Sequence, residues 1–152
     1  MNTVFNIQKL RIYLLLFSIM LGDHVHAADD IKPFTSDGCS LFPDGYADKR
    51  ELWLPCCLAH DKAYWQGGTW HQRLDADRQL KYCVVRLGEP VIAELMLNGV
   101  RIGGSPFWPT KFRWGYGWDY LRGYKPLDNN EKLSVQKALR AYEAGAGKHA
   151  RP

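Results

Sequence analysis

The sequence of 152 residues lacks several features that would place it in a membrane-spanning, repetitive or serine-hydrolase class. Its one long apolar run, residues 12–21, is too short to span a bilayer comfortably, and no second run follows. There is no internal repeat, no low-complexity tract and no Gly-x-Ser-x-Gly nucleophile elbow. We therefore expect a soluble chain with one domain and without an elbow serine.

The apolar run near the N-terminus is typical of a signal peptide. Lys9 and Arg11 precede it, and compact residues at Val25-His26-Ala27 suit a signal peptidase. We predict a signal peptide over residues 1–27, a single domain over residues 28–152, and a secreted or periplasmic protein. An uncleaved N-terminal anchor is the alternative, whereas a lipoprotein anchor is not indicated because no cysteine comes directly after the run.

Cysteine is scarce: only Cys39, Cys56, Cys57 and Cys83 are present. An exported chain meets an oxidising compartment, so two disulfides are expected. Cys56 and Cys57 are not expected to pair, because adjacent helical side chains point apart, and two cross-linked arrangements remain open. Zinc is disfavoured, since adjacent cysteines lack the usual gap between metal thiolates.

Charge is unevenly distributed along the predicted domain. Residues 28–85 carry more acidic than basic side chains, and residues 86–152 carry more basic ones. The acidic part suits a cation, and the basic part suits an anionic partner such as a lipid surface or a nucleic acid. Ordinary surface charge explains the basic part equally well.

The stretch Cys56–Trp65 is predicted to form a helix that Gly67-Gly68 ends. Residues four apart share a helix face. This spacing gives two neighbouring stripes, one with Cys56, His60 and Tyr64 and the other with Cys57 and Asp61. A plain disulfide-stapled helix with a surface His-Asp pair is the alternative interpretation.

Residues 35–45 form a predicted loop of successive Gly, Pro and Asp turns. If Cys39 pairs with Cys57, this loop lies on the stripe that carries Asp61. Backbone carbonyls and one carboxylate are the oxygen ligands that calcium takes, so a calcium site is plausible there. A loop that a disulfide merely holds in place is the alternative.

A second helix is predicted from Thr69, whose capping box includes Gln72, to about Gly88. The short glycine link makes the two helices antiparallel neighbours. Asp75 and Asp77 are the carboxylates in this region, and helix geometry alone does not decide which of them reaches His60.

The run CCLAHDKAY, residues 56–64, resembles the active-site helix of the secreted phospholipase A2 family. That family has two adjacent cysteines, two residues, His-Asp, and a tyrosine four after the histidine. Residues 76–83 are similar to its second long helix, where an Asp-Arg pair precedes a cysteine with the Asp six positions before it; Asp77 and Cys83 match. The resemblance covers roughly residues 35–87, and the loop departs from the Cys-Gly-x-Gly of many members.

The resemblance implies a site, two disulfides and an activity. It implies His60 as general base, Asp77 as its orienting partner, Tyr64 as support and Asp61 as calcium ligand. The candidate carbonyl ligands are those of Gly38, Ser40 and Phe42, and the implied disulfides are Cys39–Cys57 and Cys56–Cys83. The expected activity is calcium-dependent hydrolysis of a glycerophospholipid acyl ester, at the sn-2 position as in the family. A non-catalytic secreted membrane-binding protein on the same scaffold is the alternative.

The rest of the chain is predicted to add two helices and a small β element. The helices span residues 90–99 and 128–144, between which aromatic side chains alternate over residues 112–120 as on one face of a strand. Trp114, Trp118 and Arg113 suit contact with a phospholipid surface, although the rings alternatively roof the core. Basic and aromatic residues also suit single-stranded nucleic acid.

The overall expectation is a mainly α fold of the phospholipase A2 type. It consists of two antiparallel disulfide-linked helices with an N-terminal calcium loop and an aromatic-rich β element. Ca²⁺ is the expected cofactor and a phospholipid membrane the expected partner. We expect no nucleic acid, and no obligate protein partner is evident.

Overall fold

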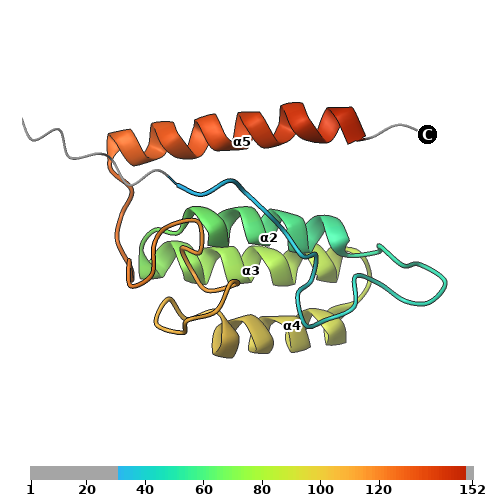
Figure 1. The fold of residues 1–152 in the computed structure, drawn as a ribbon. Coiled ribbons are helices and arrows are strands. Elements are labelled where there is room, and N and C mark those ends of the chain that lie inside the picture. The colour runs from blue at the N-terminus through green and yellow to red at the C-terminus, as the bar shows by residue number, and fades with distance from the viewer. Residues whose placement is uncertain (1–30, 150–152) are drawn as a thin grey trace, which may run out of the picture.

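The computed structural model describes residues 31–149, so the predicted signal peptide lies outside the described residues. Within that range the fold is mainly helical, as predicted. Helices α2 and α3 lie side by side, α4 lies below them, and α5 lies on the opposite side (Figure 1). None of the helices described is both long and apolar enough to cross a membrane.

Helix α2, Leu54–Gln66, contains the predicted stripes. A proline in its first turn suits a position where no backbone N–H is needed. The helix ends at Gly67, whose φ of 67° lies in the left-handed region that favours glycine. Cys56, His60 and Tyr64 are all buried, so the periodic spacing correctly predicts the inner face.

Helix α3, Trp70–Arg86, begins at the predicted capping box. The Thr69 side chain accepts a hydrogen bond from the backbone N–H of Gln72, and the Gln72 side chain accepts one from the N–H of Thr69. Its buried face carries Leu80 and Val84 at helical spacing and, on the same face, two charged residues. Burial of charged groups is costly unless they are paired, so we expect both of these residues to have partners of opposite charge or hydrogen-bond partners.

Both disulfides that the resemblance implies are present. Cys39 is bonded to Cys57, which holds the loop against α2, and Cys56 is bonded to Cys83, which ties α2 to α3. The bonded cysteines pack with the apolar core that Trp53 completes. The loop and both helices are therefore fixed to one another around the two adjacent cysteines.

Helix α4, Pro90–Gly103, is longer than predicted. Asn98-Gly99 does not end it, because the helix continues through Val100 and packs along α3. Val100 lies against the apolar core, so tertiary packing outweighs the weak helix propensity of glycine. This extra turn brings Arg101 toward α3.

The predicted aromatic β element does not form. No strand occurs in residues 31–149, and the aromatic segment folds as turns. Its backbone N–H groups bond the C-terminal carbonyls of α2: Gly115 N lies 2.6 Å from Tyr64 O, and Gly117 N lies 3.0 Å from Trp65 O. A Cβ on Gly117 would collide with the Trp65 ring, so the backbone approaches α2 as only glycine permits.

Trp114, Trp118 and Arg113 are buried, contrary to their expected role in membrane contact. The two indoles donate hydrogen bonds to carbonyl oxygens at the end of α2, with Trp114 Nε1 at 2.9 Å from Gly68 O. The Arg113 guanidinium donates to carbonyls of its own segment. These side chains satisfy buried backbone groups and so belong to the core.

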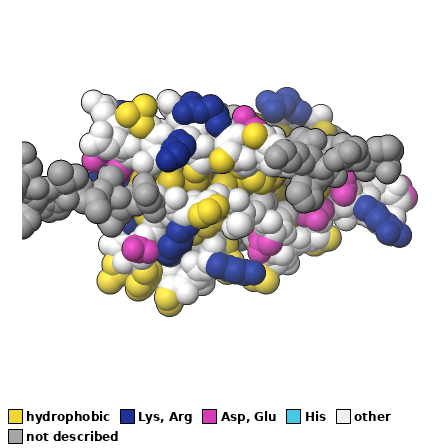
Figure 2. Space-filling model, turned by 45° about the horizontal axis from the view of Figure 1, so that its top comes forward, with side chains coloured by type: hydrophobic (Ala, Val, Ile, Leu, Met, Phe, Trp, Pro, Cys, Tyr) yellow, Lys and Arg dark blue, Asp and Glu magenta, His cyan; other side chains and the backbone are white. Residues whose placement is uncertain are grey.

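Helix α5, Asn129–His149, covers the far side of α2. Asp128 and Glu131 bond each other's backbone N–H groups at its start, as in a capping box. Its Val135 packs in a cluster with Phe34 and Trp65. On the face that Figure 2 shows, Lys and Arg side chains are scattered among acidic and apolar ones, with no single basic patch.

Candidate active site

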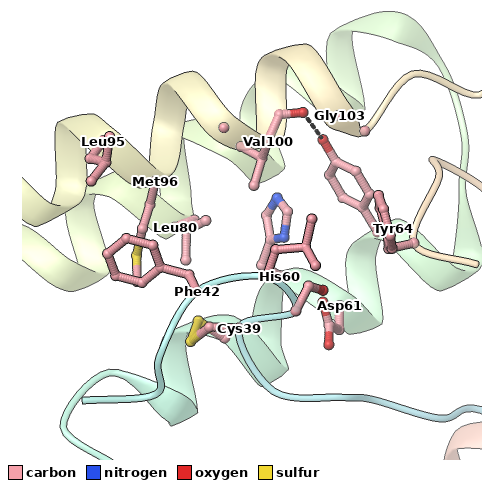
Figure 3. A pocket seen from close by; sticks show the side chains of 16 residues that line it. Cys39, Phe42, His60, Asp61, Tyr64, Leu80, Leu95, Met96, Val100 and Gly103 are labelled. Atoms are coloured by element: carbon pink, nitrogen blue, oxygen red, sulfur yellow. Dashed lines mark hydrogen bonds between the residues drawn. A yellow bond between two sulfur atoms is a disulfide. The ribbon is translucent and has the colours of Figure 1, made fainter. Parts of the chain in front are cut away.

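A cavity of about 340 Å³ lies between α2, α4 and the loop that precedes α2. Most of its wall is apolar. Figure 3 shows the His60 ring at its centre, with Phe42, Leu80 and Met96 at one end and Tyr64 at the other. Asp61 also lines it, beside the loop. A histidine that borders a mostly apolar cavity is a candidate catalytic group.

His60 and Asp77 form the predicted pair. His60 Nε2 lies 3.1 Å from Asp77 Oδ1, and Asp77 is completely buried. The neighbouring carboxylate at position 75 instead pairs with Arg78 on the exposed side of α3. The contact through Nε2 leaves Nδ1 as the nitrogen without a hydrogen bond to a described residue.

Tyr64 joins the same carboxylate oxygen. Its hydroxyl donates to Asp77 Oδ1 at 2.7 Å, and its ring packs 4.2 Å from the His60 ring, centroid to centroid. Burial, followed by the nearby Asp77 charge, raises the pKa of the Tyr64 hydroxyl. The hydroxyl therefore keeps its proton and remains a donor to the carboxylate. A Cβ on Gly104, the residue that follows α4, would overlap the Tyr64 ring, so the backbone there packs directly against this side chain.

Two arginines that sequence analysis missed complete the network. Arg73 is buried and donates from Nε to the Tyr64 hydroxyl at 3.1 Å. Arg101 Nε lies 2.6 Å from Asp77 Oδ2. The Arg101 contact is an ion pair without hydrogen-bond alignment, since both atoms lack a well-directed hydrogen bond. Arg73 precedes Asp77 by one helical turn, and that spacing is the one sequence signal that indicates either arginine.

Asp61 lies in a different electrostatic environment. Its Oδ2 accepts a hydrogen bond of 2.5 Å from the Ser36 hydroxyl, and no cation pairs with it among residues 31–149. Burial raises the pKa of Asp61 to about 7, the Ser36 bond opposes that rise, and the charges of Asp37 and Asp44 add to it. Asp61 is thus a partly buried carboxylate whose charge the described residues leave uncompensated.

The loop places its predicted ligand residues unequally. Ser40 and Phe42 line the cavity with Asp61, whereas Gly38 does not. Gly38 has a φ of 75°, and a Cβ there would collide with the carboxylate of Asp44, which accepts from the backbone N–H of Cys39. The glycine therefore serves the turn that presents the following residues.

The residues around Asp61 fit a hard cation only through backbone oxygens. No group of three or more His, Cys, Asp or Glu side chains within residues 31–149 is placed to hold a metal ion. Calcium also accepts backbone carbonyl oxygens, and the loop residues Ser40 and Phe42 stand at the same cavity as the Asp61 carboxylate. An uncompensated carboxylate beside such a loop suits calcium.

Two exposed apolar side chains line the cavity, and sequence analysis had not singled out either of them. Leu41 and Leu95 both line it, and they are 93% and 56% exposed. Ile102 is also exposed on α4. The cavity meets an apolar surface at Leu41 and Leu95, and not at the buried tryptophans.

Comparison with known proteins identifies no relative. No family model, no curated protein and no solved structure matches the chain. The functional assignment therefore rests on the geometry of the site and on the motifs of the sequence.

Proposed function

We propose that this protein hydrolyses an acyl ester of a glycerophospholipid in a calcium-dependent reaction. By family resemblance the ester is the sn-2 ester, and the products are a fatty acid and a lysophospholipid. The observation that carries the proposal is the contact of His60 with buried Asp77 at the wall of a mostly apolar cavity. An ester with long acyl chains matches that combination of an ionisable group and an apolar wall.

His60 is the proposed general base. An imidazole with a pKa near neutrality suits removal of a proton from water as the water attacks the ester carbonyl. Since Nε2 contacts Asp77, Nδ1 is the nitrogen that takes this proton. The same nitrogen returns the proton to the leaving alkoxide.

Asp77 and Tyr64 orient the base. A carboxylate on Nε2 favours the tautomer with the proton on Nε2, which leaves Nδ1 free to accept. The negative charge also stabilises the imidazolium that forms during the reaction. The Tyr64 hydroxyl shares Oδ1 with His60 and so limits the movement of the carboxylate.

Asp61 is the proposed side-chain ligand for calcium, with the carbonyls of Ser40 and Phe42 as backbone ligands and that of Gly38 as a further candidate. A bound calcium ion supplies positive charge that polarises the ester carbonyl. Ser36, which bonds Asp61 in the structure, is adjacent to this set.

The apolar residues of the cavity are the proposed acyl contacts, and a phospholipid membrane is the proposed partner. Leu41 and Leu95 connect the cavity to the surface, which suits a substrate that enters from a lipid layer. The two disulfides agree with the proposed secreted or periplasmic location, where thiols oxidise.

The test is hydrolysis of phospholipid vesicles by the purified protein, with calcium or with a chelator. We expect release of fatty acid and lysophospholipid that the chelator abolishes and that the His60→Gln variant lacks. Undiminished hydrolysis with the chelator would contradict the calcium mechanism. Vesicle binding without hydrolysis would favour the non-catalytic alternative, to which the unusual loop sequence lends support.

A further inference from the structure

The two oxygens of the Asp77 carboxylate have different partners. Oδ1 contacts His60 Nε2 and the Tyr64 hydroxyl, and Oδ2 lies 2.6 Å from Arg101 Nε. Asp77 is completely buried, so water does not share in holding it. Each oxygen is therefore oriented by protein groups alone: groups from α2 hold Oδ1, and a group from α4 lies at Oδ2.

An aspartate held at one oxygen is poorly oriented. Rotation about the Cβ–Cγ bond is broad for carboxylates, so contacts at Oδ1 alone leave the plane of the group variable. A buried carboxylate without a paired cation is also costly. The contact at Oδ2 supplies a second point of attachment and the compensating charge.

The backbone of Arg101 is itself held in place. The buried Arg73 guanidinium donates from Nη2 to the carbonyl oxygens of Val100 and Arg101, at 3.0 and 2.9 Å. The same guanidinium donates to the Tyr64 hydroxyl. One turn of α4 is thus bonded to α3 directly beside the Asp77 carboxylate.

We propose that Arg101 is a positioning residue of this site, which fixes the Asp77 carboxylate at Oδ2 so that Oδ1 holds the His60 ring in its reactive tautomer. This inference rests on the proposed function and adds to it a residue from α4 that neither motif of the sequence contains. Arg101 does not line the cavity, so it acts on the base and not on the substrate.

The test compares Arg101→Gln and Arg101→Lys with Arg78→Gln. Arg78 forms an exposed ion pair with Asp75 on the same helix as Asp77, which makes its variant a matched control. In Arg101→Gln we expect kcat to fall about tenfold or more while KM stays within about twofold, because only the orientation of the base changes. Arg101→Lys should recover part of kcat, and Arg78→Gln should behave as the wild type.

A second readout does not depend on activity. The ring nitrogens of ¹⁵N-labelled His60, assigned with the His60→Gln variant, report the tautomer by NMR at pH 8. We expect one tautomer, with the proton on Nε2, in the wild type and in Arg78→Gln, and a mixture in Arg101→Gln. If Arg101→Gln does not fold, a measurement on the wild type replaces it. The Nε proton of Arg101 should then exchange with water more slowly than the Nε proton of Arg78.

Three results would overturn the proposal. They are unchanged kcat and unchanged His60 nitrogens in Arg101→Gln, equal loss of kcat in both Arg101 variants with unchanged nitrogens, and an Arg101 Nε proton that exchanges as fast as that of Arg78. If the wild type hydrolyses no phospholipid, the proposed function fails. The nitrogen signals of Arg101→Gln against Arg78→Gln then still decide the positioning role.

Discussion

The two carboxylates beside His60 are held in opposite ways. Asp77 is completely buried between a histidine, a tyrosine hydroxyl and the Arg101 guanidinium. Asp61 accepts one hydrogen bond from Ser36. The charges near it are those of the Asp37 and Asp44 carboxylates, and no cation among the described residues pairs with it. On the Asp77 side the protein supplies its own compensating charge, and on the Asp61 side the described residues supply none.

This difference separates two tasks that a histidine base with a metal partner requires. A carboxylate that orients a base works best if it is fixed permanently. A carboxylate that binds a cation from solution must leave its charge available. The comparison thus supports the assignment of Asp77 to orientation and of Asp61 to calcium, and variants that exchange these properties test it.

The largest expected effect comes from His60, which contacts Asp77 and precedes Asp61 in the chain. His60→Gln should lower ester hydrolysis by roughly 10³-fold, since it removes the proton acceptor but keeps a side chain of similar size. Calcium affinity and the thermal unfolding midpoint should stay close to those of the wild type. Turnover near the wild-type rate would reject general-base catalysis by His60.

Asp77→Asn tests the buried carboxylate whose charge Arg101 compensates. The amide leaves Arg101 without its anionic partner, and we expect a loss of about 3 kcal/mol in the free energy of unfolding, as for other broken buried pairs. Hydrolysis should fall less than in His60→Gln, because water still meets a mispositioned imidazole. Asp75→Asn is the control for urea unfolding, since that carboxylate is exposed. Equal stability of the two variants would show that the buried network does not hold Asp77.

Glu131, in the first turn of α5 and outside the cavity, is a second carboxylate whose charge is compensated by basic side chains. Hydrogen bonds from Arg122, then from the Asp128 N–H and Lys125, lower the pKa of Glu131 to about 2 against a smaller opposing effect of burial. A lowered folded-state pKa stabilises the fold above the unfolded value near 4.5, and this stability is lost as the pH falls toward 2.

Glu131→Gln should therefore cost about 2 kcal/mol near pH 7, and its difference from the wild type should shrink below pH 4.5. Denaturant unfolding from pH 3 to 7 measures this. Glu143→Gln, which removes an exposed pair with Lys62, is the control and should show little effect. A pH-independent cost would mean that the Glu131 side chain matters for packing and not for charge.

Local patterns predicted the first half of the fold well. The stripes of α2 and the capping box at Thr69 depend on neighbours within four residues, so the sequence contains their whole signal. The disulfides and the His60–Asp77 contact followed from the family resemblance. The roles of these residues in catalysis stay predictions.

Long-range contacts explain what the sequence did not reveal. Alternating rings over residues 112–120 imitate a strand, but Gly115 and Gly117 bond the end of α2, and that partner is distant in sequence. The Arg101 contact with Asp77 depends on how α4 extends and packs along α3. Neither relation has a periodic signal within one segment.

The smallest effect is expected at Asp61, and its sign best separates the role of this carboxylate from that of Asp77. Asp61→Asn removes a partly buried charge that no described cation pairs with, while the amide oxygen still accepts from Ser36. At pH 8 without calcium we expect the variant to be about 1 kcal/mol more stable than the wild type, because an unpaired carboxylate is costly to desolvate. Asp77→Asn has the opposite sign.

With calcium present, the wild type should become more stable than Asp61→Asn, which is the reverse of the order expected without calcium. Ligand that binds only the folded state stabilises it, so millimolar calcium should raise the unfolding free energy of the wild type and not of Asp61→Asn. Few charged ligands imply weak affinity, of the order of 10⁻⁴–10⁻³ M.

Asp61→Lys should likewise lose calcium binding and hydrolysis together, while the helix persists because lysine is a good helix former. Asp48→Asn, at an exposed loop carboxylate, should keep the calcium response. If Asp61→Asn destabilised the calcium-free protein as Asp77→Asn does, both carboxylates would be structural, and the cation would have to bind elsewhere.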